Sequence, residues 1–146
     1  MSKLIQILTT NNCFFVTIVT YERMPILGEY APVLRTAIES TMSKFGANES
    51  AWVILPDHYH GIIRTESISI STILQCFKMS FASRYRLMTG KRSGLIWQSR
   101  FWDHVIRDQR DLRSHLDYIH YNPVKHGITS DPAEYLLSSY RAYFQA

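Results

Sequence analysis

Two histidines separated by one residue, His58 and His60, are the sharpest chemical feature of the sequence. The run HYHGIIR at 58–64 indicates an extended strand, in which residues two apart project from the same face. Two imidazoles side by side on one strand face can bind a metal ion together. The alternative interpretation is that both histidines lie on the surface. The strongly apolar neighbouring residues and the interruption of the strand at Pro56 and Asp57 favour a site.

A tyrosine and an asparagine, Tyr118 and Asn122, form a second feature within the run DYIHYNPVKHG at 117–127. With about 100° of rotation per residue in a helix, three apolar residues form the buried stripe. They are Leu112, Leu116 and Ile119. Tyr118 and Asn122 then lie one turn apart at the edge of this stripe, while Tyr121 points away from the core. A tyrosine held at such an edge can be aimed at a substrate, so Tyr118 is the better candidate nucleophile.

The two features together suggest a metal centre. The side-chain oxygen of Asn122 is a hard ligand, and with the nitrogens of His58 and His60 and several waters it suits octahedral Mg²⁺ or Mn²⁺. Each residue also has a plainer interpretation. Tyr118 can be a packing residue, and asparagine is common at a helix end before a proline such as Pro123.

The surrounding patterns predict one domain, 1–146, with short connections. Alternating or β-branched runs predict four strands, at 13–21, 51–55, 58–64 and 96–107. Helical spacing predicts three helices, from Pro32 to a stop at Gly46, from Ile70 to a stop at Gly90, and a last helix stopped by Asn122-Pro123. The order β-α-β-β-α-β-α indicates a ferredoxin-like α+β fold, an antiparallel sheet with helices on one face plus a C-terminal helix that carries the tyrosine. The tail from Gly127 onward is not assigned.

The positive charge is concentrated in the second half of the chain. The net charge is +4 and the pI about 9.2; residues 1–73 hold five Lys/Arg and six Asp/Glu, and residues 74–146 hold eleven and six. This excess suggests a polyanionic partner. The candidate DNA-binding residues are Lys78, Arg84, Arg86, Lys91, Arg92, Arg100 and Arg107.

Other classes of protein are disfavoured by what the sequence lacks. It has no apolar run of membrane-spanning length and no signal-peptide pattern. Its two cysteines are far apart and form no CxxC pair, which is typical of a cytoplasmic protein.

Three segments carry a family resemblance. Pro56-Asp57-His58-Tyr59-His60 resembles the proline-led His-hydrophobic-His motif of the single-tyrosine HUH transposases. The run WQSRFWDHVIR at 97–107 resembles their WQ-R-F-x-H-x-IR strand, and residues 117–127 resemble their Y-I-x-x-NPV-K-x-G segment. The branch that looks nearest is the REP-associated tyrosine transposases of bacteria. The resemblance runs from about residue 13 to 127, and three motifs in the right order are highly specific.

The resemblance implies a ferredoxin-like sheet and a divalent metal, Mg²⁺ or Mn²⁺, on His58 and His60, with Asn122 as third ligand where related enzymes often have Gln. It implies Tyr118 as the nucleophile of a single-stranded DNA endonuclease and transposase, which cleaves and rejoins hairpin-associated DNA through a 5′-phosphotyrosine intermediate. His115 is a candidate to accept the tyrosine proton. We expect single-stranded or hairpin DNA as partner, no small-molecule cofactor and no membrane, a cytoplasmic and nucleoid-associated location, and a monomer in preference to a homodimer.

Three other functions stay open. A replication initiator or relaxase of the same chemistry is disfavoured by the short chain and the single candidate tyrosine. A domesticated nucleic-acid-binding module that no longer cuts is the alternative from another class. A zinc hydrolase would need a further strong ligand, and the sequence has no HExxH motif or cysteine cluster to supply one.

Overall fold

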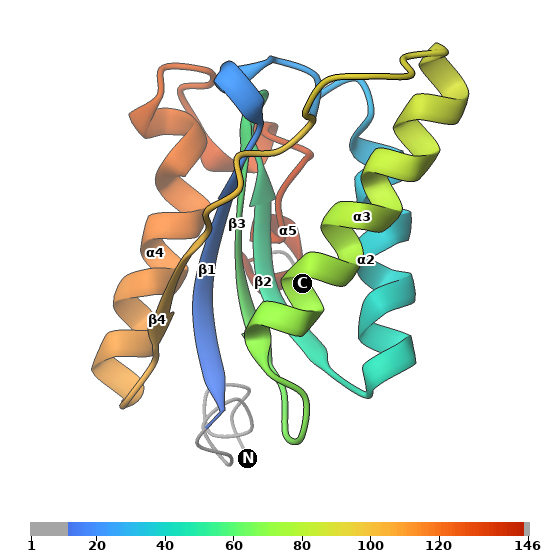
Figure 1. Ribbon diagram of the computed structural model, residues 1–146. Helices are drawn as coiled ribbons and strands as arrows, with labels where there is room; N and C mark the ends of the chain where they lie inside the picture. Colours follow the sequence, from blue (N-terminus) through green and yellow to red (C-terminus); the bar gives the residue numbers. More distant parts are fainter. Residues whose placement is uncertain (1–11, 145–146) are drawn as a thin grey trace.

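The computed structural model describes residues 12–144, which form one four-stranded antiparallel sheet with helices on both faces (Figure 1). The strands are β1 (Cys13–Val19), β2 (Asn48–Ile54), β3 (His58–Arg64) and β4 (Trp102–Val105). They lie in the order β2-β3-β1-β4, and every neighbouring pair is antiparallel. Helix α2 (Ala31–Phe45) connects β1 to β2, and α3 (Ile70–Thr89) connects β3 to β4. The expected ferredoxin-like α+β architecture is therefore confirmed.

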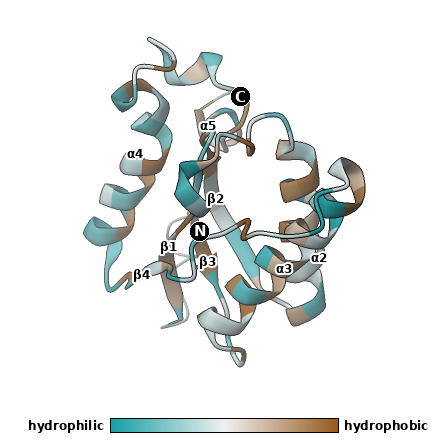
Figure 2. Cartoon of the chain, turned by 45° about the horizontal axis from the view of Figure 1, so that its top comes forward, coloured by the Kyte–Doolittle hydropathy of each residue, from teal (hydrophilic) through white to brown (hydrophobic). Residues whose placement is uncertain are grey.

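The strands divide their side chains between two cores, because successive residues point to opposite faces. Tyr59 and Ile63 of β3 pack into the core formed with α2 and α3. Ile62 packs into a smaller core with Leu112 and Ile119 of the helix α4 (Gln109–Lys125), which lies across the other face of the sheet (Figure 1). Hydrophobic and hydrophilic residues alternate along these three helices (Figure 2), the pattern of amphipathic helices. His58 and His60 share the face of Ile62, so they project toward α4.

The helix boundaries follow local chemistry. Helices α2 and α3 end at Gly46 and Gly90, whose φ angles of 62° and 75° lie in the left-handed region that favours glycine. The N-terminus of α4 is capped by the side chain of Asp108, which accepts a hydrogen bond of 2.8 Å from the backbone N–H of Asp111. The Asp108 cap fixes where α4 begins, and Leu112, Leu116 and Ile119 pack it on the sheet.

Two expected elements differ in the structure. The strand predicted at 96–107 is a strand only over Trp102–Val105. The apolar residues before it pack as a loop, in which Trp97 is buried and its indole N–H donates to the backbone oxygen of Lys78 at 2.9 Å. Pairing there is limited to an isolated antiparallel bridge between Thr20 and Trp97, so the alternation mainly reflects core packing.

The last helix does not stop at Asn122-Pro123 but continues to Lys125. Pro123 removes one backbone donor, yet the next turn closes because the N–H of His126 donates to the oxygen of Asn122 at 3.0 Å. This additional turn places His126 against His58 and Lys125 over the ring of Tyr118.

The tail forms two short helices, η2 (Pro132–Glu134) and α5 (Tyr140–Phe144), and covers the free edge of β2. Ser138 forms a β-bridge with Val53, and the N–H of Ile54 donates to the oxygen of Leu137 at 2.9 Å. The tail thereby protects an edge that is otherwise open to pairing with another chain. A third short helix, η1 (Tyr21–Arg23), follows β1.

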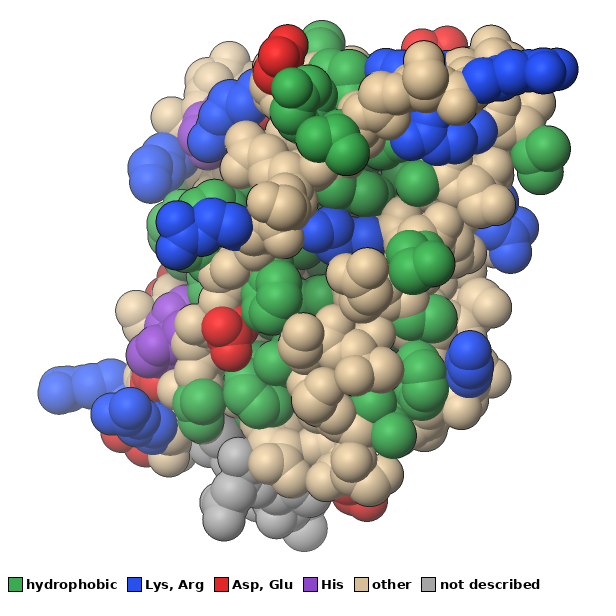
Figure 3. Space-filling view, viewed as in Figure 1, with side chains coloured by type: hydrophobic (Ala, Val, Ile, Leu, Met, Phe, Trp, Pro, Cys, Tyr) green, Lys and Arg blue, Asp and Glu red, His purple; other side chains and the backbone are tan. Residues whose placement is uncertain are grey.

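The surface carries Lys and Arg side chains on both the α4 side and the α3 side of the face seen in Figure 3. Among residues 12–144, the helices are too short or too polar to cross a membrane.

Candidate metal and tyrosine site

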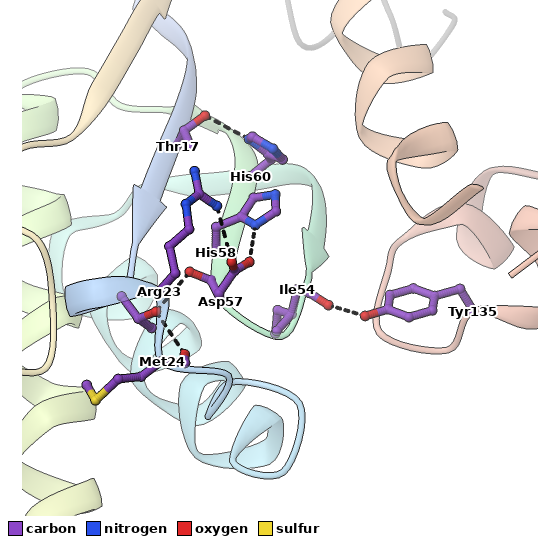
Figure 4. A network of polar contacts seen from close by, with 9 residues as sticks. Thr17, Arg23, Met24, Ile54, Asp57, His58, His60 and Tyr135 are labelled. Atoms are coloured by element: carbon purple, nitrogen blue, oxygen red, sulfur yellow. Dashed lines mark hydrogen bonds and ion pairs between the residues drawn. The ribbon is translucent and has the colours of Figure 1, made fainter. Parts of the chain in front are cut away.

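The two histidines of β3 lie side by side and point toward α4, as predicted (Figure 4). The ring centroids of His58 and His60 are 4.8 Å apart, and the rings are nearly perpendicular at 80°. Both side chains are buried, with 7% and 5% exposure. Buried polar rings need hydrogen-bond partners, and each of these two histidines has one.

The Nδ1 atom of each imidazole is engaged by a neighbouring side chain. His60 Nδ1 lies 2.7 Å from Thr17 Oγ1, across the β1–β3 pairing, and His58 Nδ1–H donates to Asp57 Oδ1 at 2.7 Å. Hydrogen bonds of this kind set the tautomer and the orientation of a metal-binding histidine. A metal ion would then be bound by the Nε2 atoms.

Asp57 is itself held by Arg23, whose Nη1 lies 3.1 Å from Asp57 Oδ2. Burial alone would raise the pKa of Asp57, but the hydrogen bonds from His58 and Arg23 lower it below its ordinary value. Glu22 and Arg23 have left-handed backbone angles (φ 52° and 53°), which cost on the order of 1–2 kcal/mol each in residues other than glycine. This unfavourable turn directs Arg23 at the carboxylate that orients the metal-ligand candidate.

His60 is held in its neutral form. Burial, together with the charges of His58, His126 and Lys125, lowers its pKa from 6.5 to about 3. Only a neutral imidazole can donate its lone pair to a metal, so at physiological pH His60 is ready to bind one.

Helix α4 places its candidate residues against this pair. The ring centroid of Tyr118 lies 5.3 Å from that of His60, and the ring of His126 lies 5.3 Å from that of His58. Residues 118, 122 and 126 follow one another at intervals of four and share one helix face. By this spacing Asn122 lies on α4 between the residues that contact His60 and His58.

Asn122 is fully buried, and neither its side-chain oxygen nor its nitrogen has a hydrogen-bond partner within the described chain. An unsatisfied buried amide costs about 1–3 kcal/mol, so its presence calls for a physical reason. A cation bound to the amide oxygen and to both histidines would supply one for the oxygen. The donor set of two nitrogens and one oxygen fits a divalent metal.

Comparison with known proteins shows the family of the chain. Residues 9–122 match the protein family described as Transposase IS200 like. The chain belongs to this family. A REP-associated tyrosine transposase of Escherichia coli K12 is 34% identical over 132 residues, which cover 87% of the chain and 74% of the relative. A Haemophilus influenzae protein assigned to the same group is 35% identical over 144 residues, which cover 90% of the chain and 81% of the relative.

Solved structures agree as well. A REP-associated tyrosine transposase bound to a REP hairpin superposes with a TM-score of 0.79 at 32% identity, covering 90% of this chain and 78% of that one. A Deinococcus radiodurans protein described as a transposase shares the fold alone, with a TM-score of 0.59 at 16% identity. The resemblance read from the sequence motifs is confirmed.

Several side chains around the candidate site were not singled out from the sequence. Phe15 stacks on His60 at 5.4 Å and meets the edge of Tyr118 at 5.7 Å, and Lys125 Nζ lies 4.9 Å from the Tyr118 ring centre. Thr17 contacts His60, and Arg23 contacts Asp57, the partner of His58. The four-residue spacing of 118, 122 and 126 could have indicated His126, but Pro123 predicted that the helix ended before it. No local sequence pattern indicates Phe15 or Thr17.

The candidate DNA-binding residues of the transposase lie in different environments. Lys78 is buried, and its amine donates to the oxygen of Gln98 at 3.0 Å. Arg86 donates to the oxygens of Lys91, Ser93 and Gly94 and so holds the loop after α3. The remaining candidates include four exposed side chains, those of Arg84, Arg92, Arg100 and Arg107.

Proposed function

We propose that the chain is a metal-dependent endonuclease and transposase that cleaves and rejoins single-stranded, hairpin-associated DNA through a covalent bond to Tyr118. The observation that carries this proposal is the placement of the Tyr118 ring 5.3 Å from His60. A tyrosine beside a two-histidine metal site can act as nucleophile while the metal offsets charge on the phosphate.

In the proposed reaction the Tyr118 hydroxyl oxygen attacks a DNA phosphorus atom in line with the departing 3′ oxygen. The bond between phosphorus and the 3′ oxygen breaks, a 5′-phosphotyrosine forms, and the phenolic proton is passed on so that the 3′ oxygen leaves as a hydroxyl. Because the phosphotyrosine ester retains the bond energy, a second 3′-hydroxyl can reverse the step and join new ends. No ATP is consumed.

The chain's own residues prepare this step. Phe15 and His60 contact the Tyr118 ring and restrict its orientation, and Lys125 places a positive charge over the ring face. Tyr118 is 39% exposed and lines an open pocket of about 720 Å³, so a strand of DNA can reach it. His58, His60 and Asn122 would hold the metal, Mg²⁺ or Mn²⁺, which when bound polarises the phosphate oxygen.

The substrate assignment rests on a relative. The similar REP-associated tyrosine transposase was solved with a REP hairpin bound, and we assign hairpin DNA with an unpaired segment to this chain. The exposed arginines Arg84, Arg92, Arg100 and Arg107 are proposed to contact its phosphates. A cytoplasmic, nucleoid-associated location follows from such a substrate.

We assign the active form as a monomer. The histidine pair on β3 and the tyrosine on α4 come from the same chain, with α4 packed on its own sheet through Leu112, Leu116 and Ile119. Both halves of the proposed site thus come from one chain, which supports a monomer.

The test uses single-stranded hairpin oligonucleotides from the DNA flanking the gene, labelled at the 3′ end because that fragment stays attached to the tyrosine. Protein is incubated with Mn²⁺ or EDTA and separated on a denaturing gel. We expect a labelled protein band with Mn²⁺ that EDTA and Tyr118→Phe both abolish.

Tyr121→Phe is the matched control, because Tyr121 lies on the same helix and is more exposed. It should retain the band. A band lost only with Tyr121→Phe would reassign the nucleophile, and tight binding without any band would replace the proposal with a non-cleaving DNA-binding module.

A further inference from the structure

A second group of metal-ligating side chains lies at the outer edge of the sheet, where β4 meets the start of α4. His104 of β4 joins Asp111 and His115 of α4. One ligand atom from each residue lies within 4.8 Å of the others. Two histidines and one carboxylate, drawn from two elements, therefore converge on a common point.

The three side chains already contact one another. His104 Nε2 lies 2.8 Å from Asp111 Oδ2. His115 Nδ1 lies 2.9 Å from the backbone oxygen of Asp111, its hydrogen-bond partner, and 3.1 Å from Asp111 Oδ1. The two imidazole rings are stacked, with centroids 4.7 Å apart and an interplanar angle of 26°. Both rings thus direct a nitrogen toward the same carboxylate.

Local structure fixes these orientations. Asp111 and His115 are four residues apart on α4, so their side chains share a helix face. The backbone N–H of Arg107 donates to Asp111 Oδ2 at 3.2 Å. A carboxylate held in this way is pre-oriented, as ligands in metal sites are.

This group is distinct from the His58–His60 pair but adjoins it. The ring of Phe15 separates the two, with its centroid 5.4 Å from that of His60 and 4.6 Å from that of His115. His115 also lines the open pocket that contains Tyr118. The second group therefore lies beside the proposed path of the DNA strand.

We infer that His104, Asp111 and His115 bind a second divalent ion. Two nitrogens and one carboxylate oxygen favour a borderline transition ion such as Zn²⁺, Mn²⁺ or Co²⁺ over Mg²⁺ or Ca²⁺. Three protein ligands leave coordination positions open for water or for a phosphate oxygen.

The bound ion fastens the edge strand β4 to α4. Strand β4 has four residues and pairs only with β1 in the described chain. A tie between His104 and α4 therefore holds this strand near the tyrosine helix. This site does not depend on Tyr118 being a nucleophile, and its test needs no DNA.

The test is a titration of the metal-free protein with Co²⁺, followed by its visible absorption and by equilibrium dialysis to give ions bound per chain. We expect His104→Ala to lose one equivalent relative to the wild type, and His115→Ala to lose the same equivalent. His104 is exposed, so its removal leaves the core intact, and circular dichroism verifies the fold. Asp103→Ala, an exposed neighbour on the same strand, is the matched control and should bind as the wild type does.

The double variant His58→Ala/His60→Ala separates the two sites. It should retain the equivalent that His104→Ala removes. The inference is overturned if His104→Ala binds as many ions as the wild type, because the three side chains then form only a hydrogen-bonded clamp.

Discussion

The imidazole of His60 and the phenol of Tyr118 meet edge to face, with centroids 5.3 Å apart and an interplanar angle of 76°. One side chain comes from the second strand of a hairpin and the other from a helix on the far side of the sheet from α2 and α3. Phe15 contacts both rings and closes the group. This contact joins the metal-ligand candidate to the candidate nucleophile within one chain.

Asn122 offers a test that separates stability from metal binding. In metal-free protein, Asn122→Leu should leave the free energy of unfolding unchanged or raise it by about 1 kcal/mol, because it replaces an unsatisfied buried amide with an apolar group of similar size. The same change should weaken Mn²⁺ binding at least tenfold. Chemical denaturation in EDTA and Mn²⁺ titration measure the two effects. A stability loss above 2 kcal/mol in EDTA would show that the amide has a structural partner.

Thr17 should act on the metal through His60. Thr17→Val removes the oxygen 2.7 Å from His60 Nδ1 while it keeps the side-chain shape. Loss of such an orienting hydrogen bond typically costs 10–100-fold in metal affinity. Thr17→Ser retains the hydroxyl and should restore most of the affinity. Equal Mn²⁺ affinities for the valine variant and the wild type would contradict this role.

Because Gly61 has no Cβ, the ring of Tyr59 can pack directly against its backbone. A Cβ at this position would lie 2.6 Å from Tyr59 Cζ and would push the ring away from Glu49, to which its hydroxyl donates. Gly61→Ala should therefore destabilise the fold by roughly 2–4 kcal/mol, from overpacking and a broken buried hydrogen bond. Gly28→Ala, where an added Cβ meets nothing within 4 Å, is the control for urea denaturation and should change stability little.

The low pKa of His60 predicts a loss of stability in acid. Its folded-state pKa is about 3, below the ordinary 6.5, so between these values the unfolded chain binds a proton that the folded chain does not. The free energy of unfolding in EDTA should then fall as the pH is lowered from about 6.5, by at most about 1.4 kcal/mol per pH unit from this group. His60→Gln should flatten this slope. An unchanged slope in the variant would assign the acid sensitivity to other groups.

Lys78 and Arg100 should affect DNA binding differently. Arg100 is exposed, and Arg100→Ala should weaken hairpin binding and reduce the slope of log affinity against log salt by about 1. Lys78→Met removes a buried amine bonded to Gln98, so it should lower stability and leave the salt slope unchanged. Fluorescence anisotropy at several salt concentrations distinguishes the two. A reduced slope for Lys78→Met would mean that its amine reaches the DNA.

Local periodicity in the sequence was sufficient to predict part of the site. The two-residue repeat of a strand determines that His58 and His60 share a face, and the helical repeat determines that Tyr118 and Asn122 do. The element order likewise predicted the ferredoxin-like sheet. These inferences succeed because each depends only on neighbouring residues or on standard connections.

Tertiary packing decided what local periodicity does not encode. The positions of Phe15 and Thr17 beside His60 depend on the pairing of β1 with β3, and the burial of Lys78 depends on how the loop around Trp97 folds over α3. The continuation of α4 past Pro123, which places His126 against His58, is likewise a result of packing on the sheet. Such contacts join residues far apart in the chain, and their free energies outweigh local propensity only once the core has formed.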